Sequence, residues 1–240
     1  MIFRSAKIMT KRSTKQIIMD NKQIDNLRIN VINAGNRLVT EGLVSRTWGN
    51  VSIRLDDTFM VITPSGRKYE DLTVNDIVKV NYHTYKYEGN IKPSSEFKLH
   101  GEIYKTRKGI NSVIHTHQMN ASTVAAAHRE VPPVLDDMAQ IIGPSVRCAG
   151  YALPSTKKIV TKTVKALKGR NAALMANHGA VCIGRDLDEA FVVCQVLEKA
   201  CKAFIEAEFL GGAKSINKLE AWMMHKVYLK KYSQQETTNK

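Results

Sequence analysis

Residues 112–120 read SVIHTHQMN, an apolar run that ends in two histidines one residue apart. Val113 and Ile114 are β-branched and favour a strand, in which alternate side chains point to the same face. His115 and His117 would then share a face, with their Cβ atoms about 7 Å apart by strand rise. Two imidazoles in this arrangement can converge on one metal ion, or they can form a hydrogen-bonded polar pair at a strand end.

A third histidine favours the metal interpretation. His178 follows AALMAN, residues 172–177, which reads as a buried strand, and Gly179 allows the chain to turn tightly beside it. Neutral imidazoles from two strand ends suit Zn²⁺, and three protein ligands leave one position open for a substrate. The cysteines at 148, 182, 194 and 201 lack the CxxC spacing of a structural zinc site. A metal bound here would therefore be catalytic.

The segment KPSSEFKLHGEIYKTR, residues 92–107, predicts a helix that follows Pro93. Pro93, Ser94 and Ser95 suit a helix start, and Glu96 then falls in the first turn. Backbone N–H groups and two hydroxyls at such a start make an anion site suited to phosphate. A carboxylate gains from the helix dipole at the same place, so Glu96 has a capping interpretation as well as a functional one.

Two further turns would supply donors of the kind a phosphate needs. Gly49-Asn50 precedes a strand-like run, and Ser65-Gly66 follows another. Each dipeptide is a common turn and indicates little when taken alone.

Along the rest of the chain, the predicted strands come in clusters between helices and do not alternate strictly with them. Helices are predicted at 22–41, 119–127 and 155–167 and in the Lys-rich tail. A long helix is predicted from Asp186 to Gly211-Gly212, with Glu189 completing a capping box at its start. Strands are predicted at 50–55, 59–63 and 76–81. Clustered strands favour helices packed on a mixed or antiparallel sheet. We expect a single domain over residues 21–232, with a disordered basic extension at 1–20 and a disordered tail at 233–240.

The composition of the chain indicates which classes of ligand and partner to expect. The chain has 36 lysines and arginines against 22 aspartates and glutamates, so its formal charge of +14 favours anionic ligands. Aromatic residues make up only 7% of the 240 residues, and no nucleic-acid-binding motif is visible, so a nucleic-acid partner is not expected. No apolar run approaches the ~20 residues of a membrane span, so no membrane partner is expected. Cysteines without a disulfide pattern fit the cytoplasm.

Five motifs in order, WGNVSIR, ITPSG, PSSE, HTH and NHG, give the chain a specific resemblance. From about Asn21 to Leu210 it resembles the class II aldolase/adducin family, of the fuculose-phosphate aldolase and ribulose-phosphate 4-epimerase type. The resemblance implies an α/β fold, a three-layer α/β/α sandwich around a mainly antiparallel sheet. It also implies C4 homotetramers with active sites between subunits.

The same resemblance assigns roles to individual residues. The zinc ligands would be His115, His117 and His178, and Glu96 would be both close to the zinc and the acid/base. The phosphate-binding residues would be those of the three turns: Gly49, Asn50, Ser65, Gly66, Ser94 and Ser95.

Differences inside the family separate the candidate functions. Adducins are scaffolds that lack the full zinc set, so its presence here favours an enzyme. Glu96 favours an aldolase, because the epimerases usually carry aspartate at this position. The loop at 134–140, VLDDMAQ, carries Asp136 and Asp137 where fuculose-phosphate aldolases carry a catalytic tyrosine and epimerases an aspartate. Asp137 and the tail residue Tyr228 are therefore further catalytic candidates.

The expected function is a zinc-dependent aldolase. It would cleave a ketose 1-phosphate similar to L-fuculose 1-phosphate into dihydroxyacetone phosphate and an aldehyde, through a zinc-stabilised enediolate. An L-ribulose-5-phosphate 4-epimerase is the alternative, because the same metal and phosphate sites serve both reactions. A non-catalytic, adducin-like scaffold is a more distant alternative.

Overall fold

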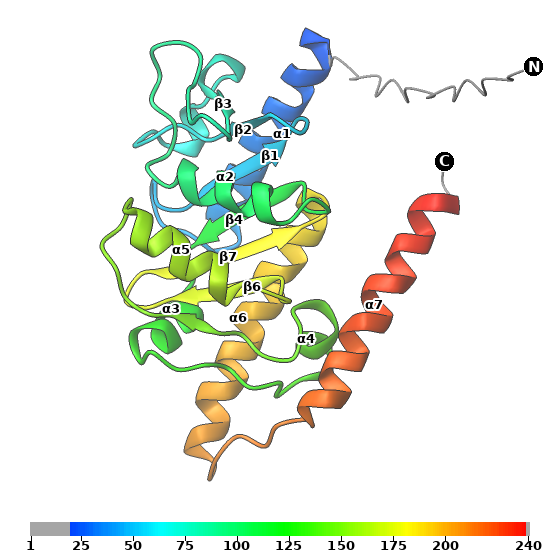
Figure 1. Cartoon of the computed structure of the whole chain (residues 1–240). Helices are drawn as coiled ribbons and strands as arrows, with labels where there is room; N and C mark the ends of the chain where they lie inside the picture. Colours follow the sequence, from blue (N-terminus) through cyan, green and yellow to red (C-terminus); the bar gives the residue numbers. More distant parts are fainter. Residues whose placement is uncertain (1–19, 239–240) are drawn as a thin grey trace, which may run out of the picture.

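A mainly antiparallel sheet forms the centre of the computed structural model, which describes residues 20–238 and side chains as far as Lys231 (Figure 1). Seven strands of this described part pair in the order β3-β2-β1-β4-β7-β6-β5. All neighbours are antiparallel except β5 and β6, which are parallel. The strands are β1 (Asn50–Arg54), β2 (Phe59–Ile62), β3 (Val78–Asn81), β4 (Ser112–Thr116), β5 (Cys148–Ala149), β6 (Ala172–Met175) and β7 (Gly179–Gly184).

Helices cover both faces of this sheet. One face carries α1 (Asn21–Thr40), α3 (Met119–Ala126) and α6 (Leu187–Phe209), and the other carries α2 (Phe97–Thr106) and α5 (Lys157–Ala166) (Figure 1). The strands alternate between the two cores: Ile114 packs with the first helix layer, and Val113 packs with the second. The predicted three-layer α/β/α sandwich is therefore confirmed.

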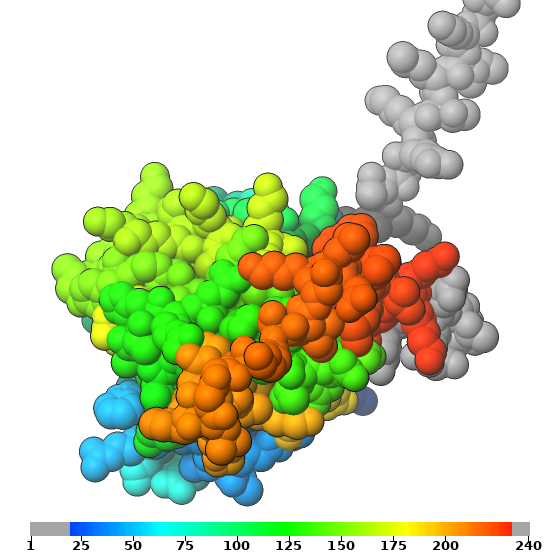
Figure 2. All heavy atoms as spheres, turned by 90° about the horizontal axis from the view of Figure 1, so that it is seen from below, coloured from blue at the N-terminus to red at the C-terminus, as the bar shows by residue number. Residues whose placement is uncertain are grey.

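Two helices lie beside the sandwich. α4 (Asp136–Ile141) packs against α7 (Lys218–Thr238), which runs along one side of the molecule (Figure 1). Figure 2 shows this C-terminal segment in orange and red, lying against the green segment that contains α4. Between residues 20 and 238, no helix is long and apolar enough to cross a membrane.

The structure corrects several boundaries. α2 begins at Phe97 with Glu96 as its N-cap residue, whereas the sequence predicted a start just after Pro93. α4, β5 and β7 were not predicted, because α4 is short and the two strands are buried without a period-2 pattern. α7 continues to Thr238 although a disordered tail was predicted from residue 233. Residues 1–19 of the predicted extension lie outside the described residues.

The predicted capping box of α6 forms only in part. Asp186 accepts the backbone N–H of Glu189 at 2.8 Å, as expected. The Glu189 carboxylate does not return the bond to Asp186. It accepts the backbone N–H of Arg185 at 2.6 Å and binds the Arg185 guanidinium. A cationic partner gives the carboxylate a stronger hydrogen bond than a second amide would.

Candidate metal and phosphate site

The three predicted histidines meet at one end of the central strands. His115 lies in β4 opposite Val181 of β7, and the hairpin between β6 and β7 carries His178 to the same end. Asn177 turns this hairpin with φ 57°, a left-handed conformation that asparagine tolerates better than most residues. The ring centroids of His115 lie 4.6 Å from His117 and 4.9 Å from His178. One ligand atom from each residue falls within 4.8 Å of the others.

The protonation pattern of these rings fits a cation. His115 Nδ1 lies 2.8 Å from the Ala180 carbonyl, which can only accept, so Nδ1 carries the proton and Nε2 presents a lone pair. His117 Nε2 faces His115 Nε2 at 2.9 Å. The two nitrogens can be joined by a proton that one ring donates to the other, or by a positive ion that accepts a lone pair from each.

A divalent metal satisfies these lone pairs better than a proton does. Burial lowers the pKa of His117 to about 3, and the neighbouring imidazoles lower it further against the pull of Glu96. Burial also lowers the pKa of His178. His117 and His178 are therefore neutral near pH 7, which is the form that binds metal. Three imidazoles fit a borderline divalent cation such as Zn²⁺.

Glu96 belongs to this cluster and does not cap its helix. It stands at the N-cap position of α2, yet within the described residues its side chain makes no capping hydrogen bond. Its Oε2 lies 3.0 Å from His115 Nε2 and accepts the Asn50 Nδ2–H at 3.0 Å, and its Oε1 lies 3.7 Å from His178 Nε2. Burial raises the pKa of this carboxyl, but charge attraction to the protonated forms of His115 and His178 and the hydrogen bond from the Asn50 amide lower it, and the net pKa is lowered. The carboxylate is therefore charged beside the histidines.

The predicted phosphate turns lie next to the histidines. A short antiparallel pairing joins two of them: Ser65 N–H donates to the Lys92 carbonyl at 3.0 Å, and Ser94 N–H donates to the Thr63 carbonyl at 3.0 Å. Gly49 adopts φ 78°, and a Cβ there would lie 2.7 Å from the His115 carbonyl oxygen. Only glycine allows the backbone to pass this close to the metal cluster.

All of these residues line one cavity of about 200 Å³. It contains every predicted metal and phosphate residue: Gly49, Asn50, Ser65, Gly66, Ser94, Ser95, Glu96, His115, His117 and His178. The sequence did not single out Thr47, Trp48, Pro64 and Pro154, which complete the wall. The first three adjoin the predicted turns and were within reach of the same motifs. Pro154 comes from a distant loop, and no sequence signal marks it.

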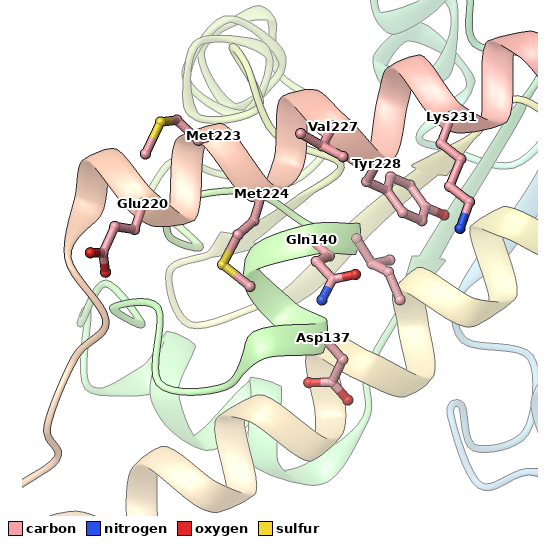
Figure 3. Close-up of a pocket in the computed structure, with 9 residues that line it drawn as sticks. Asp137, Gln140, Glu220, Met223, Met224, Val227, Tyr228 and Lys231 are labelled. Carbon is pink, nitrogen blue, oxygen red and sulfur yellow. The ribbon is translucent and has the colours of Figure 1, made fainter.

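Asp137 and Tyr228 line a different cavity, of about 700 Å³, between α4 and α7 (Figure 3). Asp137 accepts a hydrogen bond from Lys199 Nζ at 2.7 Å, and the Tyr228 hydroxyl donates to Glu189 Oε1 at 3.3 Å. Within the described part of one chain, the structure therefore does not bring these two candidates together with the histidines.

Comparison with known proteins agrees with the fold and the site. The family model for the class II aldolase and adducin N-terminal domain matches residues 29–205, most of the chain. The chain is 32% identical over 188 residues to a 5-deoxy-D-ribulose 1-phosphate aldolase of Bacillus thuringiensis serovar kurstaki, a match that covers 78% of this chain and 88% of that protein. It is 33% identical over 178 residues to a 5-methylthioribulose-1-phosphate/5-deoxyribulose-1-phosphate aldolase of Rhodospirillum rubrum, with coverage of 74% and 80%.

A solved structure of an L-fuculose 1-phosphate aldolase superposes with a TM-score of 0.81 at 31% identity, covering 85% of this chain and 96% of that one. The chain belongs to the class II aldolase/adducin family. The family resemblance and the fold inferred from the sequence are thus both confirmed.

Proposed function

We propose that this protein is a metal-dependent aldolase that cleaves a ketose 1-phosphate between C3 and C4, releasing dihydroxyacetone phosphate and an aldehyde. The similar aldolases named above act on 5-deoxyribulose 1-phosphate, 5-methylthioribulose 1-phosphate or L-fuculose 1-phosphate, ketose 1-phosphates whose chains end in a methyl or methylthio group. The observation that carries the proposal is the placement of Glu96. A buried, charged carboxylate turns away from its own helix start and into a cavity that also holds three imidazoles and three polar turns.

Each part of the cavity has a task in this reaction. The turns at Gly49-Asn50, Ser65-Gly66 and Ser94-Ser95 would bind the phosphate and so fix C3 relative to Glu96. In the cleavage direction the Glu96 carboxylate would take up the proton that the C4 hydroxyl loses as the C3–C4 bond breaks and C4 becomes the aldehyde carbon, and it would then deliver that proton to C3. In the synthesis direction the carboxylate would remove that proton.

The metal would be held by His115, His117 and His178, and we propose Zn²⁺ as the native ion because of the all-imidazole donor set. A divalent cation there supplies Lewis-acid polarisation of a carbonyl oxygen. Glu96, which lies against two of the three rings, would be displaced from them as the substrate binds.

We further propose that the protein is a cytoplasmic homotetramer of C4 symmetry with active sites between subunits. Asp137 and Tyr228 support this part of the proposal, since they line the outer groove between α4 and α7 (Figure 3). In an oligomer, such a groove can deliver side chains to the cavity of a neighbouring subunit. Sedimentation of the untagged protein tests the assembly.

The central experiment is a substrate assay. Purified protein should release dihydroxyacetone phosphate from 5-deoxyribulose 1-phosphate or L-fuculose 1-phosphate, detected by a coupled reduction. Chelation should abolish release and added Zn²⁺ should restore it. L-Ribulose 5-phosphate serves as the contrasting substrate. Its conversion to an epimer without release of dihydroxyacetone phosphate would replace the aldolase proposal by the epimerase alternative.

A further inference from the structure

Strand β1 and helix α2 are joined by a series of polar contacts that extends away from the metal cavity. Asn50 Nδ2 donates to Glu96 Oε2 at 3.0 Å, Ser52 Oγ lies 2.7 Å from His100 Nδ1, and Arg54 Nη2 donates to the Tyr104 carbonyl at 2.8 Å. The strand residues are spaced two apart and the helix residues four apart. Each set therefore lies on one face of its element. We call this series the β1–α2 ladder.

The spacing of the contact residues along β1 nearly equals their spacing along α2. Two strand residues advance by about 6.7 Å, and four helix residues advance by about 6.0 Å. The three contacts of the ladder can therefore form together in one register. A slip of one residue would shift α2 by about 1.5 Å and rotate its side chains by about 100°, which breaks all three contacts at once.

The middle contact of the ladder is completely buried. Ser52 and His100 are both 0% exposed, and Ser52 Oγ also lies 2.8 Å from the Tyr104 hydroxyl. That hydroxyl donates to the Ser52 carbonyl at 3.1 Å. Donation from His100 Nδ1–H to Ser52, from Ser52 to Tyr104 and from Tyr104 to this carbonyl is one arrangement in which each group donates once. His100 Nε2 is also buried and has no hydrogen-bond partner among the described residues.

His100 is a neutral, fully buried ring held at Nδ1 by Ser52. Burial lowers its pKa to about 3 against the opposing pull of Glu96, one helical turn earlier. A hydrogen-bonded polar contact inside a core favours one arrangement, whereas apolar side chains of similar size would tolerate small shifts. Glu96 has no capping bond of its own to fix it, so its position depends on where the ladder holds the start of α2.

We propose that His100 and Ser52 are positioning residues that set the register of α2 and thereby aim the Glu96 carboxylate at the metal cavity. This inference rests on the proposed aldolase function, in which Glu96 moves the C3 proton. Neither residue lines the cavity in the described structure, so neither touches the substrate. Their effect should therefore appear in proton transfer and not in phosphate or metal binding.

The test compares His100→Leu with His100→Asn. The two replacements are similar in size, but the asparagine amide can place a nitrogen where Nδ1 lies and so keep the bond to Ser52. We expect His100→Leu to lower kcat and the rate of solvent-deuterium exchange into dihydroxyacetone phosphate by about 10²-fold, the scale of a 1 Å misplacement. KM and bound metal should stay at wild-type values. His100→Asn should recover most of both rates.

Ser145→Ala is the matched control. Ser145 is buried like Ser52, and its hydroxyl accepts hydrogen bonds from Arg170 Nε at 3.1 Å and Arg170 Nη2 at 2.8 Å, outside the ladder. This variant should lose thermal stability while keeping kcat. Ser52→Ala provides a second probe of the ladder if His100→Leu does not fold, and it should lower kcat and exchange together.

The outcomes separate the two proposals. If the wild-type protein neither cleaves ketose 1-phosphates nor catalyses exchange, the proposed function is wrong and this inference falls with it. If the wild type is active and both Ser52→Ala and His100→Leu keep its kcat and exchange rate, the ladder does not position Glu96. A kcat loss in His100→Leu that His100→Asn fails to recover would also overturn the inference, because the Ser52 bond would then not be its cause.

Discussion

The cavity around His115 and the groove between α4 and α7 differ in what holds their residues in place. The cavity is built from the ends of β1 and β4, the β6–β7 hairpin and the start of α2, all tied to the central sheet by backbone hydrogen bonds. The groove is built from two helices at the edge of the molecule, and two flexible methionines, Met223 and Met224, form part of its wall (Figure 3).

The contrast also shows in what one chain brings together: the cavity gathers the histidines, Glu96 and the three turns, whereas Asp137 and Tyr228 line the separate groove. The pairing register of the strands fixes which side chains face the cavity. One chain therefore brings the candidate metal and phosphate residues together without a second subunit. Helix packing at the periphery gives the groove no comparable restraint. The cavity should therefore support metal binding and proton exchange without the groove, and the predictions below test that division of labour.

The largest effect is expected when a metal ligand is removed. His115→Ala should lose both bound metal and all measurable aldolase activity, because only two of the three converging histidines remain to hold the ion. Elemental analysis and the coupled assay measure the two losses. His83→Ala, an exposed histidine in a turn, is the control and should keep both. Full activity in a metal-free His115→Ala protein would rule out the metal site.

The next largest effect is expected at the acid/base. Glu96→Gln should lower kcat by ~10²–10⁴-fold, because the amide has nearly the same size but cannot take up a proton. Its metal content and KM should stay unchanged. Exchange of the C3 hydrogen of dihydroxyacetone phosphate with deuterium oxide should fall by a similar factor. Exchange at the wild-type rate would place the base elsewhere, with Asp137 from a neighbouring subunit as the next candidate.

A smaller effect is expected in the phosphate turns. Ser65→Ala and Ser95→Ala each remove one exposed hydroxyl from the cavity wall. A charge-assisted hydrogen bond contributes about 1.5–3 kcal/mol, so kcat/KM for the phosphorylated ketose should fall by roughly 10–100-fold per variant. The unphosphorylated sugar should be a poor substrate for every variant and for the wild type. Ser45→Ala, an exposed serine just before the cavity residues, should change nothing. Equal kcat/KM for sugar and sugar phosphate would show that these turns do not bind phosphate.

Substitutions in the groove between α4 and α7 are expected to have the smallest effect on the reactions of the cavity. Asp137→Asn and Tyr228→Phe should keep bound metal and the deuterium exchange of dihydroxyacetone phosphate at wild-type rates, since that half-reaction needs only the cavity. Cleavage of the whole ketose should slow in these variants if the groove serves a neighbouring subunit. The stability cost of Asp137→Asn should be ~0–1 kcal/mol, because its ion pair with Lys199 is largely exposed. Loss of deuterium exchange in either variant would show that the groove takes part in proton transfer, and that the cavity does not act alone.

The candidate site could be predicted from the sequence to a large extent because its motifs are local. His115 and His117 share a strand face by period-2 alternation, and Gly49 is required where the backbone passes the metal cluster. These are properties of a few consecutive residues, and they hold in whatever fold contains them. The boundaries of α2 could not be predicted in the same way, since Ser94 and Ser95 are good helix starters in isolation.

The tertiary structure decided the positions of those side chains whose neighbours lie far away in the sequence. It turned Glu96 from a residue of the first helical turn into an N-cap residue whose carboxylate binds Asn50 and His115 across the interface between sheet and helix. It also placed Pro154 in the cavity wall and kept Asp137 and Tyr228 out of it. The sequence by itself determined which side chains can bind a metal, a phosphate and a proton. Strand register and helix packing decided which of them meet, because those contacts join residues that lie far apart along the chain.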